Sequence, residues 1–284
     1  MASNDFRITT ILAIIMLPWL FSCSAERRIA MEYIKNDSIR EALVIPPDYL
    51  FKTSLKAFEY EDADTLSDDE LDSALYASSL FLQFIDDSVF IESYYMSYCS
   101  ELTRLGFRIY EEDSLHTFLS GKTGAYIINL AQLELEEYVM PVVEKQQFED
   151  YLYYQVIDLN AVNLNSWIEI SRMNDEEEKK LYFYSLSLTD EVDGSFKYQF
   201  FKGEVSFEYT TDSLRVEQVY WLGEYAAKIY AGLTFDYLMN QFLDRETREQ
   251  GLQRSDIYYH YDRERHWLRP AGEEEQFIPM EGER

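Results

Sequence analysis

The middle of the chain alternates apolar and polar residues in three segments, and this period of two strongly limits what it can form. The segments are 130–136, 162–170 and 181–189. Successive side chains of a β-strand point to opposite faces, so each segment has one apolar and one polar face. The pattern predicts half-buried antiparallel strands, with the acidic residues 174–178 as a hairpin loop and Asp193-Gly194 as a further turn.

Two other segments repeat apolar residues with the spacing of an α-helix. The first covers 88–105, with Asp86 able to cap its start and Gly106 suited to its end. The second covers 212–245 and carries small residues four apart, namely Gly223, Ala227 and Ala231. Such a stripe lets a helix lie close to a sheet or another helix. We expect both helices to back the sheet.

Shorter elements complete the expected fold. Residues 42–45 form an apolar strand that two prolines end, because proline lacks the donor that a strand needs. Residues 107–110 are expected as a strand, 114–120 as a short helix, and the acid-rich residues 59–73 as an exposed loop or linker. The predicted fold class is α+β: an antiparallel sheet packed against two main helices.

The first residues have the features of a bacterial lipoprotein signal. Residues 8–21 are almost wholly apolar. They are too few to cross a bilayer core of about 30 Å, which favours a cleaved export signal. The stretch ends in Leu20-Phe21-Ser22-Cys23, which resembles a lipobox, so Cys23 is the predicted lipidation site. The alternative is a cleaved secretory signal, or a short anchor, with Cys23 incidental.

The predicted domain boundaries follow from this interpretation. Residues 1–22 are the signal peptide, and 23–43 are the lipidated cysteine with a tether leading into a short helix. Residues 44–246 form the globular domain. Residues 247–284 form a polar, irregular C-terminal tail.

The charge of the chain limits its partners. It has 53 Asp and Glu against 25 Lys and Arg, a net charge of -28. Such a surface repels phosphate, which excludes nucleic acid and disfavours anionic lipid headgroups. A basic protein, a cationic peptide or divalent cations are acceptable on charge alone. The simpler interpretation is that the charge keeps an exported protein soluble.

No motif assigns a chemistry. Gly121-Lys122-Thr123 ends like a phosphate-binding loop, but His116 stands where that loop needs glycine. Asp62-Ala63-Asp64 begins like a calcium loop, but its later ligand positions do not fit. His260 and His266 do not have the spacing that places two ligands on one helix face. No catalytic, cofactor-binding or metal-ligating residue is therefore assigned.

Acidic residues keep one catalytic alternative open. Paired carboxylates cleave glycosidic bonds without a local motif, and 53 acids place some pairs together by chance. Tryptophan rings stack on sugars, although they more often belong to a core or its edge. The candidates are Trp167, Trp221 and Trp267.

A triplet of Asp, then Ser or Thr, then an apolar residue recurs along the chain. Composition predicts about one occurrence, whereas the triplet begins at Asp37, Asp64, Asp72, Asp87, Asp113 and Asp212. It is also an ordinary helix start. It resembles the O-glycosylation acceptor motif of exported proteins in Bacteroides-like bacteria, which makes Thr65 and Ser73, in the acidic segment, candidate glycosylation sites.

The lipobox and these triplets together resemble an envelope lipoprotein of the Bacteroides group. The resemblance implies an outer-membrane protein anchored by lipid on Cys23. Surface lipoproteins of such bacteria often carry acids directly after that cysteine, whereas Ser24-Ala25-Glu26 leads here into Arg27-Arg28, which favours the periplasmic side. The order of elements is similar to periplasmic accessory lipoproteins, as a likeness of fold alone.

The sequence thus predicts a membrane-anchored envelope lipoprotein with a non-catalytic binding or accessory role. Its expected partners are the membrane, through lipid on Cys23, and an envelope protein that docks on a shallow aromatic patch of the tyrosine-rich strands. Neither nucleic acid nor a cofactor is expected. The alternatives are an envelope glycan hydrolase with paired carboxylates and a carrier of an apolar ligand, which requires an internal cavity.

Overall fold

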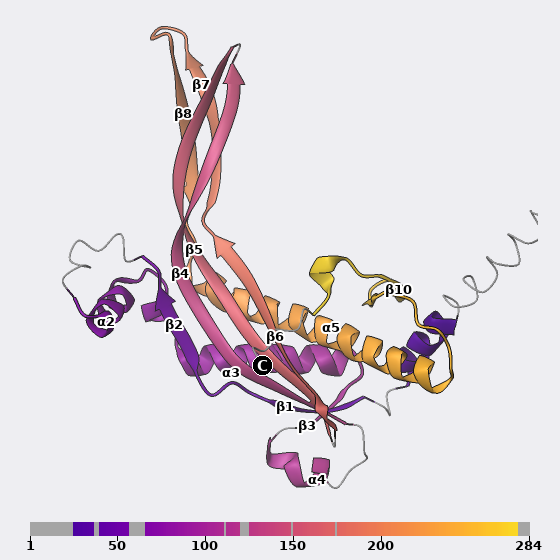
Figure 1. The fold of residues 1–284 in the computed structure, drawn as a ribbon. Helices are drawn as coiled ribbons and strands as arrows, with labels where there is room; N and C mark the ends of the chain where they lie inside the picture. The colour runs from indigo at the N-terminus through magenta and orange to yellow at the C-terminus, as the bar shows by residue number, and fades with distance from the viewer. Residues whose placement is uncertain are drawn as a thin grey trace, which may run out of the picture.

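A mixed sheet with helices along one face forms the body of the protein, and two β-hairpins project from it (Figure 1). The computed structural model describes residues 25–36, 40–56, 66–110, 112–119, 125–148, 150–173 and 175–277. The strand order of the body sheet is β3-β1-β4-β5-β6, with β2 also beside β4. These strands are β1 (Glu41–Ile45), β2 (Leu50–Ser54), β3 (Arg108–Tyr110), β4 (Tyr126–Phe148), β5 (Tyr151–Arg172) and β6 (Asp175–Thr189).

The other elements surround this sheet. A helix over 25–35 precedes β1. The helices that follow are α2 (Asp68–Ser78), η4 (Leu82–Phe84), α3 (Asp87–Arg104), η5 (Glu112–Ser114), α4 (Leu115–Leu119), α5 (Val216–Glu249) and η6 (Glu273–Glu275). Two separate hairpins are formed by β7 (Glu191–Gln199) with β8 (Glu204–Asp212), and by β9 (Tyr259–Asp262) with β10 (Trp267–Pro270).

Helix α3 occupies nearly the range that its sequence predicts. Asp86 caps its start, where the carboxylate accepts a hydrogen bond of 3.0 Å from the backbone N of Val89. Gly106 ends it with φ at 87°, a left-handed conformation that favours glycine. Helix α5 begins and ends later than the predicted 212–245, because β8 continues through Asp212.

The small residues of α5 allow it to lie close against α3. A Cβ atom at Gly223 would lie 2.7 Å from the ring of Phe90, and Ala227 and Ala231 are fully buried. Further along the same contact, the hydroxyls of Tyr98 and Thr234 are 2.6 Å apart. The prediction from these small residues is therefore confirmed: their spacing along α5 allows the two helix backbones to approach closely.

The α+β class is confirmed, but the sheet is mixed rather than antiparallel. Strand β1 pairs in parallel with β3 and β4, and β2 pairs in parallel with β4. Helices α2 and α3 carry the chain from β2 back to β3, and a helical crossover of this kind returns a strand in the same direction. Strand β1 is buried on both faces: Ala42 and Val44 join the main core, and Leu43 joins a small cluster with Phe118 of α4.

The predicted antiparallel hairpin of strands 162–170 and 181–189 is confirmed, but its loop is shorter than 174–178, and the expected turn at Asp193-Gly194 is wrong. Residues 175–178 belong to β6, and Asp193 and Gly194 lie inside β7. Glycine is needed there for space, since a Cβ atom at Gly194 would lie 2.5 Å from the ring of Phe207 on β8. The turn of this hairpin lies further along, where Gly203 has φ at 67°.

Two polar segments are more ordered than predicted. The acid-rich segment 59–73 enters α2 at Asp68, where hydrogen bonds from Ser67 to the carboxylate of Glu70 hold the pKa of Glu70 below its ordinary value. Beyond α5, the β9–β10 hairpin and η6 replace the expected irregular tail. This region is anchored by its few apolar side chains, since Tyr259, Leu268 and Phe277 are buried in the main core.

A chain of buried polar contacts marks the place where the hairpins leave the body. Glu137 of β4 is fully buried, and its carboxylate accepts hydrogen bonds from the backbone N atoms of Leu80 and Phe81 at 2.8 and 3.0 Å. It also pairs with the ammonium of Lys56 at 3.0 Å. The Lys56 Nζ donates in turn to the Asn160 Oδ1 at 2.9 Å. We call these contacts the junction network.

Asp190 extends the junction network across β6 and α5. Its Oδ2 accepts hydrogen bonds from the backbone N and the side-chain Nδ2 of Asn160, each at 2.9 Å. Its Oδ1 accepts one from the backbone N of Leu214 at 2.7 Å. One 4%-exposed carboxylate thereby joins the end of β6, the middle of β5 and the segment that leads into α5.

We expect Glu137→Gln to destabilise the protein by about 3 kcal/mol, because it leaves the buried Lys56 ammonium without its counter-charge. Glu208→Gln is the matched control, since it breaks a glutamate–lysine pair with Lys197 whose side chains are both more than half exposed. That change should cost less than about 0.5 kcal/mol. Urea unfolding of both variants measures the difference, and equal losses would contradict the role of the junction network.

Candidate functional site

The projecting arm consists of residues 139–160, the outer part of the β4–β5 hairpin, and residues 191–212, the β7–β8 hairpin. Among the described residues, no strand pairs with the outer edges of β4 and β5, because β2 and β6 pair with their inner parts. The β7–β8 hairpin runs beside them and away from the helices (Figure 1). The rings of Tyr153 and Phe196, 6.4 Å apart, join the two hairpins. At about 3.3 Å per residue, the arm reaches about 30 Å beyond the body.

The end of the arm presents large hydrophobic side chains to solvent. Phe200 and Phe201, between β7 and β8, are 81% and 102% exposed. Exposed side chains of the β4–β5 end and of β7 add to them, and we call the whole set the arm tip: Tyr151, Leu152, Tyr154, Tyr198, Phe200 and Phe201. Burying a large hydrophobic side chain contributes about 2 kcal/mol of favourable free energy, which each of these exposed side chains lacks. Such a cluster therefore indicates an interaction site.

The arm has a small core of its own. Ile157 and Leu159 of β5 are buried although they lie beyond the body sheet. Phe196 and Phe207 pack across the β7–β8 pair with ring centroids 4.8 Å apart. Two hairpins that share an apolar contact hold a fixed shape better than one isolated hairpin does. The arm therefore presents its tip from a defined support.

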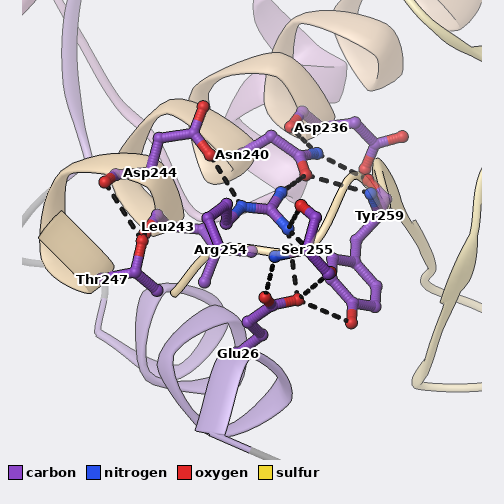
Figure 2. A network of polar contacts seen from close by, with 9 residues as sticks. All are labelled: Glu26, Asp236, Asn240, Leu243, Asp244, Thr247, Arg254, Ser255 and Tyr259. Carbon is purple, nitrogen blue, oxygen red and sulfur yellow. Dashed lines mark hydrogen bonds and ion pairs between the residues drawn. The ribbon is translucent and has the colours of Figure 1, made fainter. Parts of the chain in front are cut away.

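The opposite end of the body holds the N-terminal helix in place (Figure 2). Glu26, only 1% exposed, accepts hydrogen bonds from the backbone N and the Oγ of Ser255 at 2.5 and 2.6 Å. It also accepts from the Tyr259 hydroxyl at 3.2 Å and pairs with Arg254 at 3.2 Å. Arg254 is bound at the same time to Asp244 of α5 at 2.7 Å. The helix over 25–35 is thereby fastened to the C-terminal end of α5.

A buried arginine secures the other end of this helix. Arg40 is 1% exposed, and its guanidinium donates to the backbone oxygens of Tyr33 and Ile34. It also donates to the oxygen of Gly106 at 3.3 Å and lies 5.7 Å from the ring centroid of Phe235. Residues 25–36 and 40–43 therefore belong to the folded body, whereas a tether was expected over much of 23–43.

The predicted site residues do not come together in the described structure. Cys23 and Thr65 lie outside the described residues. Ser73 is exposed on α2 rather than in a linker, and its Oγ donates to the backbone oxygen of Asp69 at 2.8 Å. The aromatic arm tip was not predicted: the expected contact surface was a shallow patch on the tyrosine-rich strands, whereas Phe200 and Phe201 lie in the turn between β7 and β8.

The closest approach to catalytic chemistry is a buried Asp–His pair. The Asp236 Oδ2 lies 2.5 Å from the His260 Nδ1, and its Oδ1 accepts a hydrogen bond of 3.0 Å from the backbone N of Tyr261. Burial raises the pKa of Asp236, and the hydrogen bond to Asp236 raises the pKa of His260. These contacts fasten β9 to α5. Among the described residues, no group of three or more His, Cys, Asp or Glu is arranged to hold a metal.

Compared with known proteins, the chain matches no protein-family model and no curated protein sequence. In the parts of the chain that the structure describes, none of the helices is both long and apolar enough to cross a membrane. The arm tip is therefore the candidate functional site on its geometry and exposure.

The Asp236–His260 pair should make stability depend on pH. A raised pKa means that the folded state holds the His260 proton more tightly, so this contribution is complete below the ordinary pKa of about 6.5 and is lost as pH rises through the raised value. The contribution of Asp236 to stability also decreases as pH rises, because its folded pKa is raised as well.

We expect the difference in unfolding free energy between the unchanged chain and His260→Asn to be largest near pH ~6 and to shrink toward pH ~9. His266→Asn is the control on the same hairpin, at a position where φ is 48° and asparagine is tolerated. Chemical unfolding across this pH range gives both curves. A difference that stays constant with pH would show that the pair gains nothing from the charge on His260.

Proposed function

We propose that this protein is an envelope lipoprotein with a non-catalytic binding role, held at the outer membrane by lipid on Cys23 and facing the periplasm. The observation that carries the proposal is the arm tip, where Phe200 and Phe201 are almost wholly exposed at the end of a supported arm. A monomer gains nothing from such exposure, whereas a partner that covers the tip recovers the burial energy. Residues 1–22 are then the cleaved signal, and no cofactor takes part.

The folded N-terminal helix limits how far the body can lie from a lipid on Cys23. Glu26, three residues after Cys23, is already buried in the body. Three residues span at most about 10 Å, so lipid on Cys23 keeps the body against the bilayer rather than on a long tether. Several acyl chains make such anchoring durable, whereas one chain binds only marginally.

The arm and the anchor lie at opposite ends of α5. Asp190 joins the base of the arm to Leu214, just before α5, whereas Arg254 links Glu26 to Asp244 near its other end. At 1.5 Å per residue, these ends are about 40 Å apart. We take α3 and α5 as the two main helices that connect them. The protein would thus present its arm to a partner away from the point of lipid attachment.

Charge narrows the class of partner. With a net charge of -28, the protein favours a neutral or basic protein surface and disfavours nucleic acid and anionic lipid. The apolar arm tip calls for an apolar pocket or groove on that partner. We further propose O-glycosylation at Thr65 and at Ser73, whose side chain is exposed on α2.

The anchoring proposal predicts that a fatty-acid probe labels the protein in its native cells and that Cys23→Ser abolishes the label. The reason is that only the thiol of Cys23 stands at the lipobox position. Cys99→Ser, which removes the other cysteine, should leave labelling intact. Fluorescence of the clicked probe after gel separation measures it. An unlabelled chain that still begins at Met1 would exclude the lipoprotein.

The arm proposal predicts site-specific crosslinking in the native envelope. A photoreactive phenylalanine analogue at position 201 should give one discrete crosslinked protein, because that side chain is 102% exposed at the arm tip. The same analogue at Tyr49, which is 72% exposed on the body, is the control. The variant F200S/F201S should weaken recovery of the crosslinked partner at least about tenfold in co-purification without changing stability. Equal crosslinking at both positions would reject the arm as the binding site.

A further inference from the structure

The outer face of the body sheet, opposite α3 and α5, carries polar and aromatic side chains in register. Its orientation follows from alternation, because Leu133, Leu135 and Leu164 point into the helix-covered core. Their neighbours on β4, β5 and β6 form three rows, which are Glu136–Asn163–Ser187, Glu134–Asn165–Ser185 and Gln132–Trp167–Phe183. Strands lie about 4.8 Å apart and rows about 7 Å apart. We call this set the outer-face array.

Asn163, on the middle strand β5, organises the polar groups around it. Its Nδ2 donates to the Glu136 Oε2 at 3.0 Å and to the Asn165 Oδ1 at 2.9 Å. Its Oδ1 accepts hydrogen bonds from the hydroxyls of Ser185 and Ser187 at 2.7 and 3.0 Å. The side chains of three strands are therefore held in fixed positions before any ligand arrives.

The second glutamate of the array is held in the same way. The Glu134 Oε1 accepts a hydrogen bond from the Thr53 Oγ1 at 3.1 Å, and its Oε2 accepts one from the Asn165 Nδ2 at 3.5 Å. Asn165 is 5% exposed, so its amide is fixed by its surroundings. Each carboxylate has about four acceptor positions and these contacts use only some of them, so further hydroxyl donors can bind.

Aromatic rings stand beside the polar rows. Trp167 and Phe183 pack together with ring centroids 4.9 Å apart, and Phe183 is 37% exposed. At the other end of the rows, the Tyr138 hydroxyl lies 3.5 Å from the Ser187 Oγ. Phe51 of β2, paired in register with Glu134, is 49% exposed at the edge. Carboxylates, amides and hydroxyls are thus bordered by flat apolar surfaces.

This combination matches the chemistry of a sugar. A pyranose ring has a face of C–H groups that packs on an aromatic ring, and a rim of hydroxyls that donate to carboxylate and amide oxygens. The net charge of -28 and the carboxylates of Glu134 and Glu136 oppose an anionic glycan, which leaves a neutral one. A saccharide also needs no third acidic ligand, in contrast to a calcium ion.

We propose that the outer-face array binds a neutral oligosaccharide, with Trp167 and Phe183 packing on one ring and the carboxylates of Glu134 and Glu136 accepting hydrogen bonds from its hydroxyls. Glu134 and Glu136 each accept a hydrogen bond from a neighbouring side chain, Thr53 and Asn163 respectively, which suits acceptors for sugar hydroxyls more than a hydrolytic acid and base. The role is therefore binding without cleavage. It is independent of the arm tip and goes beyond the docking role proposed above.

The test is calorimetric titration of the purified full chain with three neutral hexasaccharides, made of β-1,4-linked glucose, α-1,4-linked glucose and β-1,4-linked N-acetylglucosamine. We expect at least one to bind with a Kd between about 10 μM and 1 mM. Trp167→Ala should weaken this binding at least about tenfold, and Glu136→Gln about fivefold. Trp167→Phe keeps a stacking surface and should lose less, which preserves the test if the alanine variant unfolds.

Trp221→Ala is the matched control, since Trp221 is 52% exposed on α5 and stacks on Tyr225 at 4.9 Å, away from the outer face. It should bind as the unchanged chain does, and so should F200S/F201S, which separates this proposal from the arm. Three results would overturn it: no heat with any of the three sugars up to about 1 mM, equal losses in Trp167→Ala and Trp221→Ala, or release of shorter sugars, which would make the site catalytic.

Discussion

The buried ion pair between Glu137 and Lys56 determines where the body of this protein ends and its arm begins. The pairing of β2 with β4 ends at Glu137, and the pairing of β6 with β5 ends at Ala161. Backbone and side-chain groups beyond these points must find other partners. The fully buried Glu137 carboxylate supplies acceptors to Lys56 and to the loop before η4, and Asp190 does the same for Asn160 and Leu214. Burying these charges costs free energy that only complete hydrogen bonding offsets. A sheet that continued unbroken would need none of them.

The junction network separates two parts of the strands β4 and β5, which belong to the body core at one end and to the arm at the other. The inner parts of β4 and β5 are packed on helices, with residues such as Leu135 and Leu164 fully buried. The outer parts continue without that support, and the β7–β8 hairpin packs on the opposite face of β5, the face that carries Tyr153, Ile157 and Leu159. The arm is therefore an extension of the core strands. Its tip can stay exposed because the body does not depend on burying it.

The sequence predicted what depends on local periodicity and missed what depends on distant contacts. Helix α3 follows from its apolar spacing and its Asp86 and Gly106 ends, and the close packing of α5 follows from Gly223. The parallel pairing of β1 does not, because a short apolar strand carries no signal of direction. Neither does the arm, whose strands pair with each other beyond the alternating segment and have only a small core, at Ile157 and Leu159, to impose a period of two.

In the candidate sites, too, the sequence indicates the residue types but not the distant contacts that bring them together. The sequence predicted a shallow aromatic patch on the tyrosine-rich strands without assigning its residues, whereas the exposed Phe200 and Phe201 lie in the turn after Gln199, at the end of the arm. Glu134 and Glu136 appeared in the sequence merely as the polar side of an alternating segment. They form part of a polar array only because Asn163 and Asn165 occupy the paired positions on the neighbouring strand β5. Charge and composition do not encode a register, so neither surface was assignable from the chain alone.

The two proposed surfaces share strands yet should act independently. Glu136 and Phe148 mark the outer-face array and the end of the arm on the same strand β4, and the intervening residues extend over about 40 Å at 3.3 Å each. Coupling over that distance requires an element with two arrangements that both ligands bias. The junction network lies between them, and its closed set of hydrogen bonds around Glu137 and Asp190 favours one arrangement. Saccharide on the body and a protein on the arm would then bind additively, which suits a spacer that holds two envelope components at a fixed separation.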